Sequence, residues 1–450
     1  MSFIDTLRGW FSPVRSDEET MGDDATQPVM RRIEIRASEP RTRRVLPTFR
    51  GIINRPRTTN QSDARLDRTR AQVRDVFAPS QPVTDERVFA GRTKVLKHLI
   101  EVIEHRMSHV VIFGERGIGK TSILHILHKL AADSDYTVLH STCGARSEFS
   151  STFRTMLKGV PLRFHQSVSP AIERGDQSGG LTSLLPEGEF DARELSEVLA
   201  SITSTRVIIL LDEYDRVESE LFRQSIAELI KNLSDAAARV QLVIAGVSPN
   251  LDELIGYVPS IRRNIIGVPI QRLASDEVRE ILRIGEEASG LAFASGAAAM
   301  VEQLGNGSPY LVRLIAYQSS MIALDAGRYD VREEDVAAGL ERMVEETEAR
   351  LPVLIAQRVR LADPGAYPAP LAELAALAGT PNGWFSFEGK RPSPQVHALV
   401  EKFGNAGLLE RRRDSAGESE AMHFVDEGLP SYLWMLAARA TRAQKSSVAA

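Results

Sequence analysis

The sequence predicts an α/β fold: a parallel sheet covered by helices, then a helical region, then a helix–helix–hairpin unit. Three observations predict it. Residues 110–113 form an apolar run that leads into a glycine-rich loop and an amphipathic helix. Residues 207–211 form a second apolar run, which ends in two acidic residues. After residue 364, two helical segments precede two strand-like segments separated by a polar tip.

The composition fits a soluble globular protein of about three domains. The chain has 450 residues, of which 43% are hydrophobic and 26% charged, and a formal net charge of −5. That charge argues against a globally basic nucleic-acid binder. The single cysteine, Cys143, excludes a disulfide framework and suits a reducing cytosol. No apolar run is long enough to span a membrane, so we expect a cytoplasmic protein, with peripheral membrane contact as an option.

Residues 1–80 are predicted to be a largely disordered, arginine-rich region with a short amphipathic start. Residues 1–11 place five apolar side chains on one side of a helical wheel: Phe3, Ile4, Leu7, Trp10 and Phe11. This segment either anchors the chain to a membrane or a partner, or packs on its own protein. The arginines between residues 31 and 74 either bind nucleic acid or anionic lipid, or belong to a solvated tether.

Residues 114–121 read G-x-x-x-x-G-K-T between a strand and a helix, which is the context of a phosphate-binding loop. Its glycines let successive backbone N–H groups point at one phosphate chain, and the helix N-terminus adds its dipole. Lys120 is predicted to reach the β and γ phosphates of ATP, and Thr121 to offer its hydroxyl to Mg²⁺. The predicted nucleotide-binding residues here are Gly114, Glu115, Arg116, Gly117, Ile118, Gly119, Lys120, Thr121 and Ser122.

The two acidic residues after the second apolar run are Asp212 and Glu213. They stand at the carboxyl end of a strand, where ligands gather in open α/β sheets. Asp212 is predicted to hold Mg²⁺ through water, opposite Thr121. Glu213 is predicted to be the general base for an attacking water. Together with the loop, this pair predicts an ATPase.

Val88, Phe89 and Arg92 precede the loop in an F-x-G-R segment. With this segment, the chain resembles the AAA+ and STAND branch of P-loop ATPases, near the origin-recognition-complex-like ATPases of bacteria and archaea. The resemblance implies that these three residues contact base or phosphate. It also implies a γ-phosphate sensor at the end of the strand 241–248: Ser248, with Asn250 as a second candidate.

Arg262 and Arg263 precede the last strand, as an arginine finger does in the resembled families. A finger stabilises transition-state charge on a neighbour's nucleotide; Arg263 is slightly preferred, and pairing with local acids is the alternative. Gly307-Ser308-Pro309 resembles the G-x-P element of STAND ATPases, whose proline packs near adenine. Other AAA+ members carry an arginine at the position of Tyr310, and Arg313, one turn later, would reach the γ-phosphate instead.

We therefore expect an ATPase core over residues 81–270, a helical lid over 271–348, and a winged-helix domain and tail over 349–450. Helix 393–407 would occupy the DNA-reading position, with Arg411, Arg412 and Arg413 toward phosphates. The acidic wing tip favours protein contacts or autoinhibition over DNA.

The predicted function is a slowly hydrolysing ATP switch that forms a homo-oligomer in the ATP state and acts on a protein partner. The alternative is a DNA-binding ATPase of the origin-recognition or transposition-helper type. A metabolic kinase is disfavoured because the sequence offers no acceptor pocket.

Overall fold

The computed structural model describes residues 61–78, 81–166, 180–248, 251–255, 259–379, 384–413, 420–426 and 428–449. All of them belong to one compact unit, Thr59–Ala450. The predicted amphipathic start, the arginines before residue 61, Asn250 and the hairpin tip lie outside the described residues.

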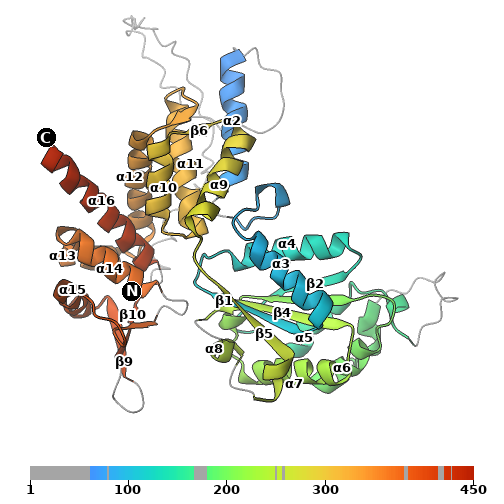
Figure 1. The fold of residues 1–450 in the computed structure, drawn as a ribbon. Coiled ribbons are helices and arrows are strands. Elements are labelled where there is room, and N and C mark those ends of the chain that lie inside the picture. Colours follow the sequence, from blue (N-terminus) through green and yellow to red (C-terminus); the bar gives the residue numbers. More distant parts are fainter. Residues whose placement is uncertain are drawn as a thin grey trace, which may run out of the picture. The chain divides into compact units, whose positions relative to one another are not determined.

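A five-stranded parallel sheet forms the centre of the predicted ATPase core (Figure 1). In sheet order the strands are β2 (Thr137–Thr142), β3 (Val207–Asp212), β4 (Val240–Val247), β1 (His109–Gly114) and β5 (Ile265–Ile270). β3 is buried along its whole length, because a parallel sheet is covered on both faces. This confirms the predicted α/β fold.

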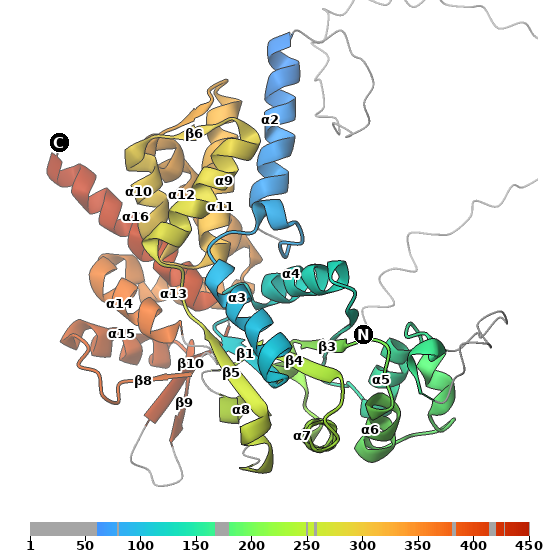
Figure 2. The same cartoon turned by 45° about the vertical axis from the view of Figure 1, so that its right-hand side comes forward.

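Helices cover both faces of the sheet (Figure 2). Successive side chains of each strand point to opposite faces, so Ile208 and Leu210 pack with the helices of one face, and Ile209 and Leu211 with those of the other. The first face carries α3 (Thr93–Glu101) and α4 (Lys120–Asp133). The second carries α5 (Phe149–Leu157), α6 (Ala192–Ala200), α7 (Glu220–Asp235) and α8 (Leu251–Ile255).

His109, at the start of β1, makes folding stability depend on pH. Its Nδ1 accepts the Leu242 N–H at 3.0 Å, its Nε2 lies 3.2 Å from Ser234 Oγ, and burial lowers its pKa from 6.5 to about 4. The unfolded chain therefore binds a proton that the folded chain does not as pH falls from about 6.5 to about 4, and stability is lost in that window. We expect a loss of about 2 kcal/mol from this group between pH 7 and pH 5.

Urea unfolding of the wild type and of His109→Asn at these two pH values measures this loss. Asn keeps an acceptor toward Leu242 but does not titrate, so the variant should lose less stability on acidification. Equal losses in both proteins would contradict the assignment.

Four helices form the predicted lid: α9 (Ser275–Ser289), α10 (Ser295–Gly305), α11 (Pro309–Asp325) and α12 (Glu333–Arg350). Short strands β6 (Ala292–Phe293) and β7 (Asp330–Val331) pair beside them. Ser308 caps α11 by accepting the Leu311 N–H, and Pro309 occupies the first turn, where its missing N–H costs no hydrogen bond. The turn before α11 therefore has a defined conformation.

Helix α2 (Gln61–Phe77) corrects the prediction for residues 61–77, which the sequence analysis placed in a largely disordered region. Its apolar face is narrow, but Phe77 is fully buried in the core of the lid. A Cβ on Gly285 would lie 2.2 Å from the Phe77 ring, so glycine makes room for it. Arg70 also donates to Leu324 O and Asp325. Packing on the lid stabilises a helix whose own sequence is mostly polar.

The C-terminal part begins with α13 (Val353–Ala362), α14 (Pro368–Ala378), β8 (Trp384–Ser386) and α15 (Pro394–Asn405). It continues with β9 (Leu409–Arg413), β10 (Glu420–Phe424) and α16 (Leu429–Ala449). The three strands form an antiparallel sheet in the order β8-β10-β9. This arrangement is consistent with the predicted winged helix, although the sequence analysis missed α13 and β8.

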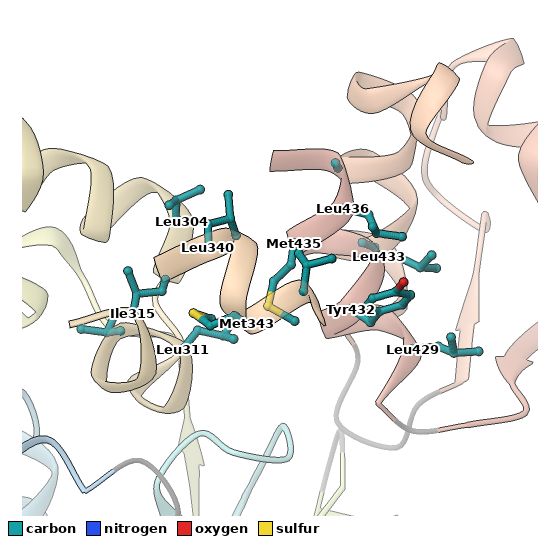
Figure 3. Packing of buried hydrophobic residues seen from close by; sticks show 14 of the residues in the cluster. Leu304, Leu311, Ile315, Leu340, Met343, Leu429, Tyr432, Leu433, Met435 and Leu436 are labelled. Carbon is teal, nitrogen blue, oxygen red and sulfur yellow. The ribbon is translucent and has the colours of Figure 1, made fainter. Parts of the chain in front are cut away.

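α16 (Leu429–Ala449) corrects the prediction that residues 436–450 are a frayed tail, because the helix continues to Ala449. Leu429, Leu433 and Ala437 in its first half are fully buried. Figure 3 shows Met435 of α16 pointing toward the lid residues Leu340 and Met343, whereas Leu429 and Leu433 lie on the other side of the helix. The Trp434 indole also donates to Leu304 O at 2.9 Å. The last helix of the chain thus packs on the lid.

Of the helices described, none is long and apolar enough to cross a membrane.

Candidate functional site

The phosphate loop joins the end of β1 to the start of α4. Gly117 and Gly119 have φ values of 73° and 97°, in the left-handed region that favours glycine. A Cβ on Gly114 would lie 2.6 Å from the Ile270 carbonyl oxygen of β5. A larger residue at this position, where the chain passes from the sheet into the loop, would therefore clash with β5. The predicted strand–loop–helix arrangement is present.

Lys120 lies beneath this loop with 8% of its surface exposed. Its Nζ donates to Gly114 O at 3.0 Å and Glu115 O at 2.8 Å. Burial lowers the pKa of Lys120 to about 8, against the charges of Asp215 and Asp212, which raise it. The nearby carboxylates favour the charged form of the buried Lys120, and a bound polyphosphate would favour it further.

Asp212 and Glu213 lie at the carboxyl end of β3. Asp212 is 3% exposed, and its Oδ1 accepts the Glu213 N–H at 2.8 Å. Glu213 has a φ of 53°, an uncommon backbone conformation for a residue other than glycine that is often found at functional sites. The Glu213 carboxylate forms an ion pair with Arg216 at 3.2 Å. Asp215, which the sequence analysis did not assign, accepts the Val247 N–H of β4 at 2.8 Å.

These residues share a cavity of about 1360 Å³. Its walls include loop residues 115–122, the acidic residues at and just after the end of β3, the segment of Phe89 and Arg92, and the start of α11. Ideal Cβ atoms on Gly117 and Gly119 would lie 3.7 Å from Tyr310 and 3.9 Å from Pro309, so α11 begins directly against the loop. The same cavity extends to Ala378 of α14 and Trp434 of α16.

Arg92 lies between the core and the lid. Its Nη2 donates to Gln271 O at 2.7 Å and to Ile118 O at 3.4 Å, and burial lowers its pKa. Arg92 Nε is buried and has no hydrogen-bond partner within the described ranges. A buried donor of this kind on the cavity wall suits a nucleotide acceptor atom.

Arg313 also lines the cavity, but its contacts differ from the predicted reach toward the γ-phosphate. Its Nη1 donates to Val76 O at 2.5 Å and its Nη2 to Val88 O at 2.7 Å. Burial lowers the pKa of Arg313 to about 10. Val88 itself is not on the cavity wall and packs against the lid core. In this structure Arg313 joins α2 and the Phe89 segment to the lid.

The remaining predicted residues lie off the cavity wall. Ser248 follows β4 and is 2% exposed. Arg262 and Arg263 are exposed on the short helix Pro259–Asn264 before β5. Among the described residues, no group of three histidine, cysteine, aspartate or glutamate side chains is placed to hold a metal ion. A Mg²⁺ ion would thus depend on nucleotide phosphates and water in addition to Thr121 and Asp212.

Sequence reasoning missed three contacts around the site. Arg272 forms an ion pair with Glu115 of the loop, at 3.0 Å between Nη2 and Oε2. Glu280 of α9 accepts the Gly91 N–H at 2.9 Å. The Ser122 hydroxyl accepts the Val83 N–H at 3.0 Å. Each of these contacts joins segments that are far apart in the sequence, so no short sequence pattern predicts it.

Residues 103–255 match the family model of the AAA domain. Solved structures that are similar to this chain include Cdc6p from Pyrobaculum aerophilum and the Orc1 protein of Aeropyrum pernix in complex with DNA. Each is 16% identical, with a TM-score of 0.43, covering 82% of this chain and 98% of the other. A third is the RuvB Holliday junction branch migration motor of Thermotoga maritima, 14% identical, with a TM-score of 0.41, covering 77% and 96%. No curated protein matches the chain.

Proposed function

We propose that this chain, which carries the AAA domain of a P-loop ATPase, is a MgATP-dependent molecular switch that hydrolyses ATP slowly. The observation that carries the proposal is the shared cavity. Phosphate-loop residues, the Asp212–Glu213 pair, the start of the lid helix α11 and the C-terminal helices α14 and α16 all line it. A nucleotide in this space lies between the core and the parts that would respond to it.

The chain's own residues have separate roles in this proposal. The backbone N–H groups of residues 115–122 and the Lys120 ammonium hold the phosphates. Thr121 and Asp212 hold Mg²⁺, which neutralises phosphate charge when it is bound. Phe89, Arg92 and Pro309 surround the base. Glu213 accepts the proton of the attacking water.

Two observations favour a slow switch over a metabolic kinase. Glu213 is paired with Arg216, so the carboxylate has to leave this ion pair before it can orient a water. The wall of the cavity includes residues of the chain's own C-terminal helices α14 and α16, such as Ala378 and Trp434. A nucleotide bound in this cavity can therefore use its binding energy to change the contact between the core and the C-terminal helices.

A protein partner is proposed ahead of DNA for the C-terminal part. Arg411 of β9 is paired with Glu401 of α15 at 2.8 Å and with Glu420 of β10 at 3.6 Å. Because both carboxylates already bind the Arg411 guanidinium, Arg411 would have to leave these ion pairs before it could contact DNA phosphates. The alternative, a DNA-binding ATPase of the origin-recognition or transposition-helper type, predicts duplex DNA binding whose affinity falls steeply with salt.

Assembly tests the switch directly. We expect the Glu213→Gln chain to form a homo-oligomer with MgATP and to dissociate with ADP, as measured by light scattering. In the wild-type background, Arg263→Ala should lower turnover at least about 100-fold without weakening ATP binding, because a finger acts on the neighbouring subunit. Arg193→Ala, at an exposed ion pair on α6, is the matched control. Equal mass in ATP and ADP would rule out nucleotide-controlled assembly.

A further inference from the structure

Arg272, between β5 and α9, connects three parts of the chain. Its Nε donates to both Glu115 carboxylate oxygens at 3.1 Å and 3.0 Å, which joins it to the phosphate loop. Its Nη1 donates to Asn306 O at 3.4 Å, in the turn before α11. A Cβ on Gly379 would lie 2.5 Å from its Nη2, so the guanidinium also packs against the end of α14.

The ion pair between Arg272 and Glu115 faces the nucleotide cavity. Both residues line it, and their side chains are 32% and 27% exposed. A guanidinium presents parallel N–H groups that match a carboxylate and a phosphate equally well. A phosphate that enters the cavity can therefore replace the carboxylate as the partner of Arg272.

The two lid residues that the sequence placed near the γ-phosphate, Tyr310 and Arg313, are less suited to that exchange. Tyr310 carries no charge. Arg313 is 8% exposed and already bonded to two backbone carbonyls, which would lose their donors if it moved. Arg272 is held by one partly exposed carboxylate and by one long hydrogen bond, of 3.4 Å, to Asn306 O, and its release from the ion pair leaves Glu115 accessible to water.

We propose that Arg272 is the side chain that distinguishes ATP from ADP: the terminal phosphate of ATP takes its guanidinium from Glu115. This inference rests on the proposed function. It assigns Glu115 the role of a competitor that holds Arg272 when no γ-phosphate is present. Because Arg272 also contacts the ends of α10 and α14, the exchange reports the nucleotide state to the lid and the C-terminal helices.

Calorimetric titrations of the 450-residue chain with MgADP and with a non-hydrolysable ATP analogue test the proposal. Arg272→Ala should weaken binding of the ATP analogue about 10-fold or more, because a charge-assisted hydrogen bond is lost. Binding of ADP should change by less than about 2-fold. Glu115→Gln should have the opposite sign and strengthen binding of the ATP analogue, because it removes the competing carboxylate.

The opposite signs separate this role from a structural one. If the ion pair only holds the loop, both substitutions weaken ADP and ATP-analogue binding alike, and that result overturns the proposal. Arg279→Ala is the matched control, because Arg279 is also a lid arginine in an ion pair, with Glu302, but lies off the cavity wall. Thermal unfolding shows that each variant is folded. A wild-type chain that binds neither nucleotide would contradict the proposed function itself.

Discussion

Replacing Glu213 with glutamine is expected to stop ATP turnover while ATP remains bound. Glutamine keeps the shape of the side chain but cannot accept the proton of the attacking water. Loss of a general base lowers turnover by about 10²- to 10⁴-fold. Phosphate release measures turnover, and a fluorescent ATP analogue measures binding to the same variant.

Arg216→Ala is the informative companion to this substitution. Its loss releases Glu213 from the ion pair, so turnover should be retained or raised. The stability of the chain should change little, because both side chains are more than a third exposed. If Glu213→Gln kept wild-type turnover, the base would have to be another group, and Asp215 on the same cavity wall would be examined next.

Lys120→Ala is expected to lower ATP affinity at least about 100-fold, since it removes the one buried ammonium group beneath the phosphate loop, a charged donor to the phosphates. The fold should persist, because the two carbonyl oxygens that Lys120 contacts lie in a loop that borders the cavity. With the pKa of Lys120 at about 8, the ammonium form is lost as pH rises through that value. Bound phosphates raise this pKa, so binding at higher pH takes up a proton, and the ATP affinity of the wild type should decline as pH rises above about 8.

The core of the fold could be predicted because its signals are local. β3 is a continuous apolar run, as a strand buried on both faces has to be. The phosphate loop carries its glycines where the backbone is left-handed, at Gly117 and Gly119. Short-range patterns of this kind determine the sheet and its loop, and Asp212 and Glu213 follow from the end of β3.

The helices at the two ends could not be predicted, because tertiary packing stabilises them. α2 has a narrow apolar face that is buried only because Gly285 leaves space for Phe77. α16 continues past its buried first half, and its hydrogen bond from Trp434 to Leu304 of the lid joins residues 130 positions apart. Neither partner can be recognised from the sequence of the helix itself.

The arginines show the same limit within the site. The sequence favoured Arg313 because of its distance from the G-x-P element, whereas the fold turns it toward Val76 and Val88. No role was predicted for Arg272, because its partner Glu115 is far away in the sequence. Which arginine faces the cavity is decided by how the lid packs on the core, and not by spacing within the lid.

The most direct test of ATP binding at this site is a calorimetric titration of the wild-type chain and of Lys120→Ala with MgATP under identical conditions. The account predicts saturable binding of one ATP per wild-type chain, and at least about 100-fold weaker binding to the folded variant. Equal affinity of both proteins for MgATP would show that the nucleotide does not bind over the phosphate loop, and would contradict the account.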